Sequence, residues 1–225
     1  MERQFQKELE SLKTSLIKMG SVVEENFDKS IQSVIEKSST LADQVIETDL
    51  RVDALEIEID NAVVDLLALR QPVASDLRFI LAALKINNDL ERISDHAVNI
   101  AQAAQVLCSI PNARILDEIP QMASLTKTML KEALDSFILL NPSMAQKVLK
   151  SDDRIDDLNR LVTKKVIEVM KDSSESVESE MELVRISKNL ERIADLTTNI
   201  AEEVLFHTQA RVVKHHAEEK EKSDL

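Results

Sequence analysis

One helical segment occurs twice in this chain of 225 residues. Residues 88–101 read NDLERISDHAVNIA, and residues 188–201, 100 positions later, read KNLERIADLTTNIA, with 8 of 14 positions identical. The shared letters include a polar string whose members lie four residues apart, a spacing that places side chains on one face of an α-helix. The repetition indicates a tandem of two homologous units and singles out one helix face in each.

The duplication extends to the helix that precedes each copy. Residues 41–56 (LADQVIETDLRVDALE) align with residues 144–159 (MAQKVLKSDDRIDDLN) at an offset of 103, which places Asp152 over Asp49. The two offsets are close and hold across whole half-chains. They therefore predict two homologous units with a small difference in length between the second and third helices.

Long helices are the expected elements, because the chain has one glycine and four prolines. A sheet protein of this size needs many tight turns, most of them with Gly, Asn or Pro, whereas long helices need few. Hydrophobic residues make up 44% of the chain and aromatic residues only 2%, so the core must be aliphatic side chains and Met. The predicted fold is all-α, a tandem pair of three-helix bundles with six long antiparallel helices.

Breaks in the helical pattern give the predicted boundaries. In the first unit, apolar residues recur at spacings of three and four over about 5–35, 41–69 and 75–108. Turns are expected at 38–40, 141–143 and 172–176. The predicted division is a first unit (1–110), a connector (111–120), a second unit (121–215) and a charged tail (216–225).

The net charge of −13 argues against nucleic acid or an anionic membrane surface as a partner, since both require a basic face. A cation or a basic protein fits better. Cys108 is the only cysteine, so no internal disulfide is expected. The charged N-terminus does not resemble a signal peptide, and no apolar run approaches the roughly 20 residues that span a bilayer. We expect a cytoplasmic protein.

Pairs of acidic residues four apart are informative only where they recur. The chain has ten such pairs, against roughly seven to eight expected by chance from its composition. Glu56 and Asp60 become Asn159 and Thr163 in the second unit, so that pair does not recur and is not a candidate. Four pairs remain as candidate sites: Asp49/Asp53, Glu91/Asp95, Asp152/Asp156 and Glu191/Asp195.

Carboxylates on two neighbouring helices form an oxygen-rich site suited to Mg, Ca, Mn or Fe ions. The alternative is a solvated outer face, which an acidic helical protein carries in any case. Arg92 and Arg192 also recur, either as surface ion pairs or as contacts to an anion or a partner protein. His96 becomes Leu196 and is a poor candidate for a ligand shared by both units.

Several enzyme classes are disfavoured. The single glycine, Gly20, cannot supply a phosphate-binding glycine-rich loop. A ferritin-like di-iron site needs Glu-x-x-His motifs, and no histidine of the chain has Glu three residues before it. We therefore expect a non-enzymatic protein without an organic cofactor.

The duplicated units, the E-R-I-x-D-x-x-x-N-I-A string in both, and DLR after QPVAS together resemble the PhoU family of phosphate-signalling regulators. The resemblance covers nearly the whole chain. It implies a mostly homodimeric, cytoplasmic accessory protein of the phosphate-specific ABC transporter that represses the phosphate-starvation response. Its implied partners are a sensor histidine kinase and the transporter's ATPase subunit, with membrane association only through them.

The resemblance also implies multinuclear metal clusters on the bundle surface, held by pairs of acids with three residues between them. Fe, Zn, Mn or Mg are the candidate ions, and all four recurring pairs match the family's motif. Three differences between the units, at Asp89/Asn189, Ser94/Ala194 and His96/Leu196, leave the second cluster with fewer possible ligands.

Two functions follow as hypotheses. The first is a negative regulator of the phosphate-starvation response that restrains phosphate uptake and links the transporter to the kinase. The second is a metal-binding or structural helical protein whose acidic stripes hold cations.

Overall fold

The computed structural model describes residues 2–172 and 177–210. Its helices are α1 (Glu2–Ile35), α2 (Ser39–Arg70), α3 (Ala74–Ser109), α4 (Glu118–Leu139), α5 (Pro142–Leu149), α6 (Asp153–Asp172) and α7 (Val177–Gln209). The described residues contain no strand, and the all-α prediction of paired three-helix bundles is confirmed. The predicted turn at 172–176 and the predicted charged tail fall almost entirely outside the described residues.

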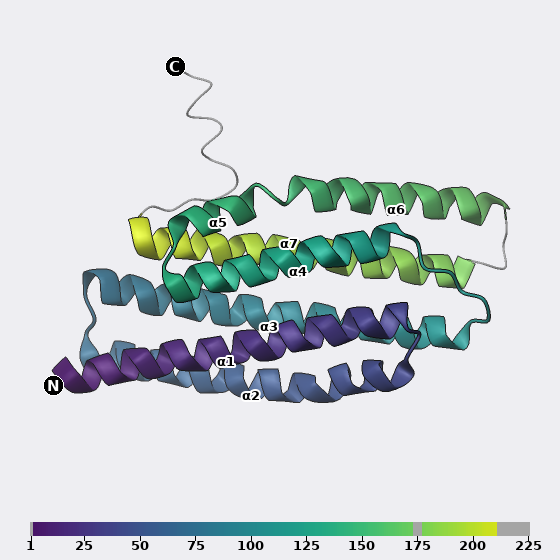
Figure 1. Ribbon diagram of the computed structural model, residues 1–225. Coiled ribbons are helices and arrows are strands. Elements are labelled where there is room, and N and C mark those ends of the chain that lie inside the picture. Colours follow the sequence, from purple (N-terminus) through teal and green to yellow (C-terminus); the bar gives the residue numbers. More distant parts are fainter. Residues whose placement is uncertain (1, 173–176, 211–225) are drawn as a thin grey trace, which may run out of the picture.

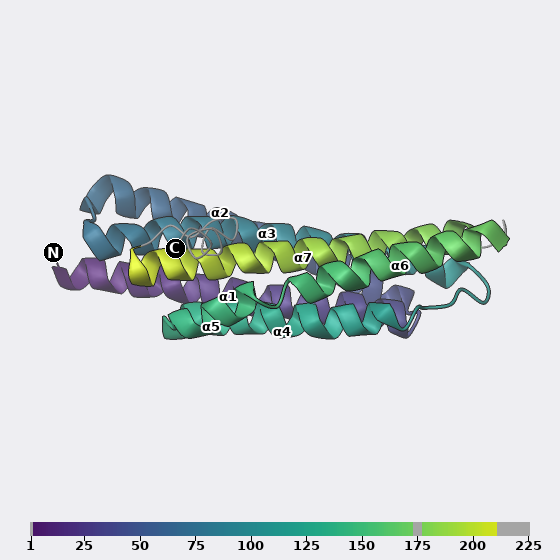
Figure 2. The same ribbon diagram turned by 90° about the horizontal axis from the view of Figure 1, so that it is seen from above.

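The two bundles lie side by side with their helices along one long axis (Figure 1). Helices α1, α2 and α3 pack on one another, and α7 packs on α4, α5 and α6. The bundles meet where α3 runs against α7 and α1 against α4, and the view from above shows the same arrangement (Figure 2). Helices α2 and α6 form opposite edges of the molecule in Figure 1.

The second helix of the second unit is broken, although the sequence pattern predicts one helix there. Helix α5 ends at Leu149 and α6 begins at Asp153. The polar run between them satisfies backbone groups locally, because the Ser151 hydroxyl donates to the Lys147 carbonyl and the Asp152 carbonyl accepts from the amide of Ile155. Ser and Asp compete with the helical ladder in this way. The first unit has Thr48, Asp49 and Leu50 at this place, and α2 continues through it.

Capping side chains set two of the helix starts. The Ser38 hydroxyl accepts from the amide of Leu41 at the start of α2. The Asn141 side chain accepts from the amides of Ser143 and Met144 at the start of α5. Both residues lie in turns that the sequence predicts, and such caps satisfy amides that have no partner within the helix.

The one glycine lies where the units touch. A Cβ atom on Gly20 of α1 would lie 3.1 Å from Cδ2 of Leu134 on α4. That distance is shorter than ordinary van der Waals contact, so the missing side chain lets the two helices approach closely. Buried aliphatic residues of both units join in one continuous core.

Polar contacts join α3 to α7 along their length. Lys85 forms an ion pair with Glu203 at 2.7 Å, and Asn199 donates a hydrogen bond to the buried carboxylate of Asp89. Arg185 donates to the side-chain oxygen of Gln102 at 2.8 Å. These contacts hold α3 and α7 antiparallel in a fixed register and so join the two bundles.

Candidate functional site

The first acidic cluster lies between α2 and α3. Its members are the carboxylates of Asp49, Asp53, Glu56, Glu91 and Asp95. Burial, followed by the neighbouring charges of the other four carboxylates with Asp95 foremost, raises the pKa of Glu91 to about 7. Asp49, Asp53 and Glu56 belong to α2 and Asp95 to α3, so the two predicted acid pairs lie within electrostatic range of each other.

Buried polar side chains lie beneath the first cluster. The Ser94 hydroxyl donates to Oδ1 of Asp49 at 2.7 Å and accepts from Nδ2 of Asn26 on α1 at 3.4 Å. Burial raises the pKa of Asp49, and the Ser94 hydrogen bond partly offsets this. All three helices of the unit therefore position this carboxylate.

A second amide is buried beside the cluster. Nδ2 of Asn87 donates to Oδ1 of Asp60 at 2.9 Å and to the carbonyl of Glu56 at 3.1 Å. The Oδ1 atoms of Asn26 and Asn87 are both buried without a hydrogen-bond partner in the structure. The base of the first cluster thus has spare oxygen acceptors in addition to its carboxylates.

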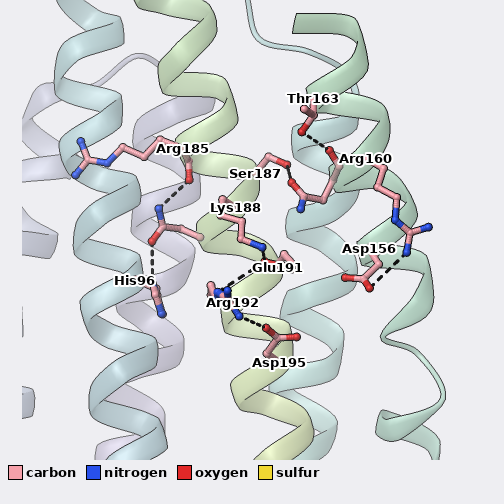
Figure 3. Close-up of polar contacts among 12 residues, drawn as sticks. His96, Asp156, Arg160, Thr163, Arg185, Ser187, Lys188, Glu191, Arg192 and Asp195 are labelled. Atoms are coloured by element: carbon pink, nitrogen blue, oxygen red, sulfur yellow. Dashed lines mark hydrogen bonds and ion pairs between the residues drawn. The ribbon is translucent and has the colours of Figure 1, made fainter. Parts of the chain in front are cut away.

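The second acidic cluster lies between α7 and the α5–α6 region, and basic residues surround it (Figure 3). Asp156, Glu191 and Asp195 lie near one another there. Asp152, the fourth predicted acid, immediately precedes α6. Arg192 pairs with Asp195 at 3.0 Å, and Arg160 lies 3.6 Å from Asp156. Lys188 pairs closely with Glu191. Burial raises the pKa of Asp195, followed by the charge of Glu191, while Arg192 lowers it.

The two clusters therefore differ in charge although their acids correspond. Lys188 takes the place of Asn88, and Arg160 takes the place of Ile57. Among the described residues, no carboxylate of the first cluster forms a salt bridge. The acids of the first cluster thus have no basic partner among the described residues, whereas those of the second cluster pair with Arg160, Lys188 and Arg192.

The predicted metal ligands share two surfaces but do not converge tightly. In the described part of the chain, no three His, Cys, Asp or Glu side chains are close enough to coordinate one metal ion. The donor chemistry of the first cluster nevertheless suits a hard cation, because carboxylate oxygens dominate it and no basic side chain competes.

Recurrence between the units did not identify every residue of these surfaces. Glu56 does not recur, because its equivalent is Asn159, yet its charge raises the pKa of Glu91. Recurrence also does not identify the countercharges Lys188 and Arg160. The sequence does contain a signal for both basic residues. When the two units are aligned, Lys188 and Arg160 are basic residues present in the second unit only.

The recurring arginines have different surroundings. Arg192 forms the ion pair with Asp195 and lies 4.0 Å from Glu191. Arg92 is exposed, and its charge lowers the pKa of Asp89, which burial raises to about 6. Nδ1 of His96 lies 2.8 Å from Oδ1 of Asn189, so this histidine joins the two units.

Comparison with known proteins gives matches along both units. A family model described as PhoU domain matches residues 16–104 and 119–204. A phosphate-specific transport system accessory protein PhoU homolog of Clostridium acetobutylicum is 34% identical, with 90% of this chain and 93% of that protein covered. A homolog of the same description from Aquifex aeolicus is also 34% identical, with 95% and 97% covered.

Two solved structures have the same fold. The crystal structure of PhoU from Pseudomonas aeruginosa matches with a TM-score of 0.90 and 33% identity, covering 92% of this chain and 100% of that one. The phosphate transport system regulatory protein PhoU from Streptococcus pneumoniae matches with a TM-score of 0.88 and 31% identity, covering 94% and 100%. None of the described helices combines the length and apolar composition needed to cross a membrane. The family inferred from the repeated string is thus confirmed, and the chain belongs to the PhoU family.

Proposed function

We propose that this protein is a cytoplasmic accessory protein of a phosphate-specific transport system and a negative regulator of the phosphate-starvation response. The supporting observation is full-length similarity to proteins named for that transport system, in sequence and in fold. In this role it acts without catalysis, as a homodimer that links the transporter's ATPase subunit to a sensor histidine kinase. It holds the kinase in its repressing state and restrains uptake when phosphate is plentiful.

Deletion of the gene tests this role. A phosphate-starvation reporter measured in high phosphate should rise from its repressed level, and phosphate uptake should increase. Expression of the intact chain from a second locus should restore repression. A reporter that stays repressed in the deletion strain would contradict the proposal.

The first acidic cluster supports a second role, cation binding, which is compatible with regulation. Asp49, Asp53, Glu91 and Asp95 would supply the ligands, with Glu56 beside them. Their side chains would have to move closer together on binding, because in this structure no three of them are close enough to coordinate one ion. The uncompensated charge of this cluster supports the role, because Lys188 and Arg160 already neutralise the corresponding acids of the second cluster. A bound Mg, Mn, Fe or Zn ion would supply the positive charge that the first cluster lacks.

Two matched variants test whether metal binds and where. We expect Asp95→Ala in the first cluster to remove most of the bound metal measured by elemental analysis or by Mn²⁺ titration calorimetry. Asp195→Ala, at the corresponding place in the second cluster, should remove less. Equal losses would contradict the assignment to the first cluster, and no metal in the unaltered protein would contradict cation binding while leaving the regulatory role intact.

A further inference from the structure

The outer face of α2 carries a row of exposed, mostly apolar side chains. Leu50, Ile57 and Val64 are 73%, 61% and 62% exposed and lie seven residues apart. The row also includes small or polar residues between them, and we call the full set the α2 stripe: Leu50, Ala54, Ile57, Asn61, Val64 and Ala68. Alternate spacings of four and three residues are those of the contact seam of a coiled coil.

Packing inside the bundle does not account for this stripe. Helix α2 buries a different set of residues, among them Val52, Leu55, Ile59 and Val63, against α1 and α3. The residues of the stripe are exposed, and α2 itself lies at one edge of the molecule (Figure 1).

The corresponding face of the second unit has a different composition. At the offset of 103, five of the six corresponding positions on α6 are charged: Asp153, Asp157, Arg160, Lys164 and Lys171, with Ile167 the exception. The same edge of a homologous bundle is thus polar in one unit and apolar in the other. The α2 stripe is a feature of this surface and not of the fold.

Acidic residues flank the α2 stripe and restrict what can cover it. Asp53, Glu58, Asp60 and Asp65 lie beside it, with Arg51 the one basic neighbour among the flanking positions. Helix α2 has eight acidic and two basic residues, whereas α6 has five of each. A second copy docked by α2 against α2 would place acid against acid, and an anionic membrane would be repelled. A helix flanked by Lys and Arg would be attracted.

We propose that the α2 stripe is the docking surface for an amphipathic helix of another protein, whose apolar residues pack on Leu50, Ile57 and Val64 and whose basic residues face the acidic flanks. The stripe from Leu50 to Val64 is about 21 Å long at 1.5 Å per residue, enough for four turns of a docked helix. Asn61 places one amide within the seam, which favours a single register.

A peptide of defined chemistry tests the proposal directly. The probe is a fluorescently labelled three-heptad helix with Leu and Ala in its seam and Lys at the flanking positions. Its binding to the full chain is measured by fluorescence anisotropy at low and high salt. We expect saturable binding that weakens with salt, and no binding of a peptide with the same seam and Glu at the flanks or of a scrambled peptide with the same Lys content.

Variants of the chain then locate the binding surface. The combination Leu50→Gln, Ile57→Gln and Val64→Gln removes the apolar contacts without changing the charge, and Gln is a good helix former. The triple variant should bind the basic peptide with an affinity about tenfold lower or more, and Ile57→Gln alone should cause a smaller loss of affinity. The control, Leu161→Gln with Ile167→Gln, changes exposed apolar residues of α6 and should leave binding unchanged.

Three results would overturn the proposal. The first is equal binding of the basic peptide to the triple variant and the unaltered chain. The second is equal binding of the peptides with Glu and with Lys at their flanks, which would contradict the charge argument. The third is loss of a dimer in the triple variant, seen by light scattering, which would assign the α2 stripe to a second copy. Peptide binding is measured separately from the phosphate-starvation reporter, so either the docking surface or the regulatory role can be contradicted without the other.

Discussion

The pKa of Glu91 depends strongly on the residues around it. Its pKa of about 7 lies well above the ordinary 4.5 because burial and four nearby carboxylates disfavour its charge. Between about pH 4.5 and pH 7, the Glu91 carboxyl group is protonated in the folded protein and ionised in the unfolded chain. The stabilisation from Glu91 is therefore fully present below about pH 4.5 and is lost as the pH rises through about 7.

The variant Glu91→Gln should remove this pH dependence. We expect a higher free energy of unfolding than the unaltered protein at pH 8, and little difference at pH 4.5, because Gln resembles the protonated acid. Urea denaturation at the two pH values measures the effect. Glu47→Gln, an exposed position of α2 outside the cluster, serves as control, and an equal response of both variants would contradict the explanation.

The contrast between the clusters leads to a second prediction at this scale. Asn88→Lys introduces into the first cluster the base that Lys188 supplies to the second. We expect the new ammonium group to pair with Glu91, lower its pKa and weaken cation binding to the first cluster. NMR titration of the Glu91 carboxyl and Mn²⁺ calorimetry give the two readouts. Lys188→Asn, the reverse exchange, should strengthen cation binding to the second cluster, and an unchanged Glu91 pKa in Asn88→Lys would be evidence against the pairing.

Much of the candidate site could be predicted from the sequence, because helical periodicity and recurrence between units are both one-dimensional patterns. They selected the recurring pairs, and the structure places two of these pairs, Asp49/Asp53 and Glu91/Asp95, beside each other. Charge compensation depends on which side chains reach across between helices. For that reason the pairing of Arg160 with Asp156 and the contribution of Glu56 required the structure.

Among the elements, α4 ends in a strained conformation that the sequence pattern does not reveal. Leu140, its C-cap, has φ of 50° in the left-handed region, where a Cβ atom is unfavourable. A chain with one glycine must use other residues at such positions. Helix termini could be predicted from Ser38 and Asn141, but a positive φ at a leucine could not.

Leu140→Gly should therefore stabilise the protein by about 1 kcal/mol, since glycine adopts this conformation without the steric cost. The matched control is Leu139→Gly, one residue earlier and within α4, where glycine should destabilise by about 1 kcal/mol. Thermal or urea unfolding of the two variants measures the opposite signs. Destabilisation of both would show that φ at Leu140 is not the governing factor.

At the scale of the whole molecule, the contact of α1 with α4 depends on Gly20. Gly20→Leu should lower the free energy of unfolding by about 1–3 kcal/mol, because the new side chain must displace Leu134 in a close-packed contact. Leu134→Ala, combined with Gly20→Leu, should recover part of the loss by vacating the space. Urea denaturation of the two variants and the double variant tests this, and additive losses without recovery would place the strain elsewhere.

The joining of both units in one chain has a consequence for how such a protein can evolve. In a dimer of identical three-helix subunits, every substitution appears twice, and both edges must change together. Here α2 and α6 are encoded separately, so one edge has acquired an apolar stripe and the other charged residues. With both units in one chain, the two edges can change independently, and a single small protein can present two different surfaces.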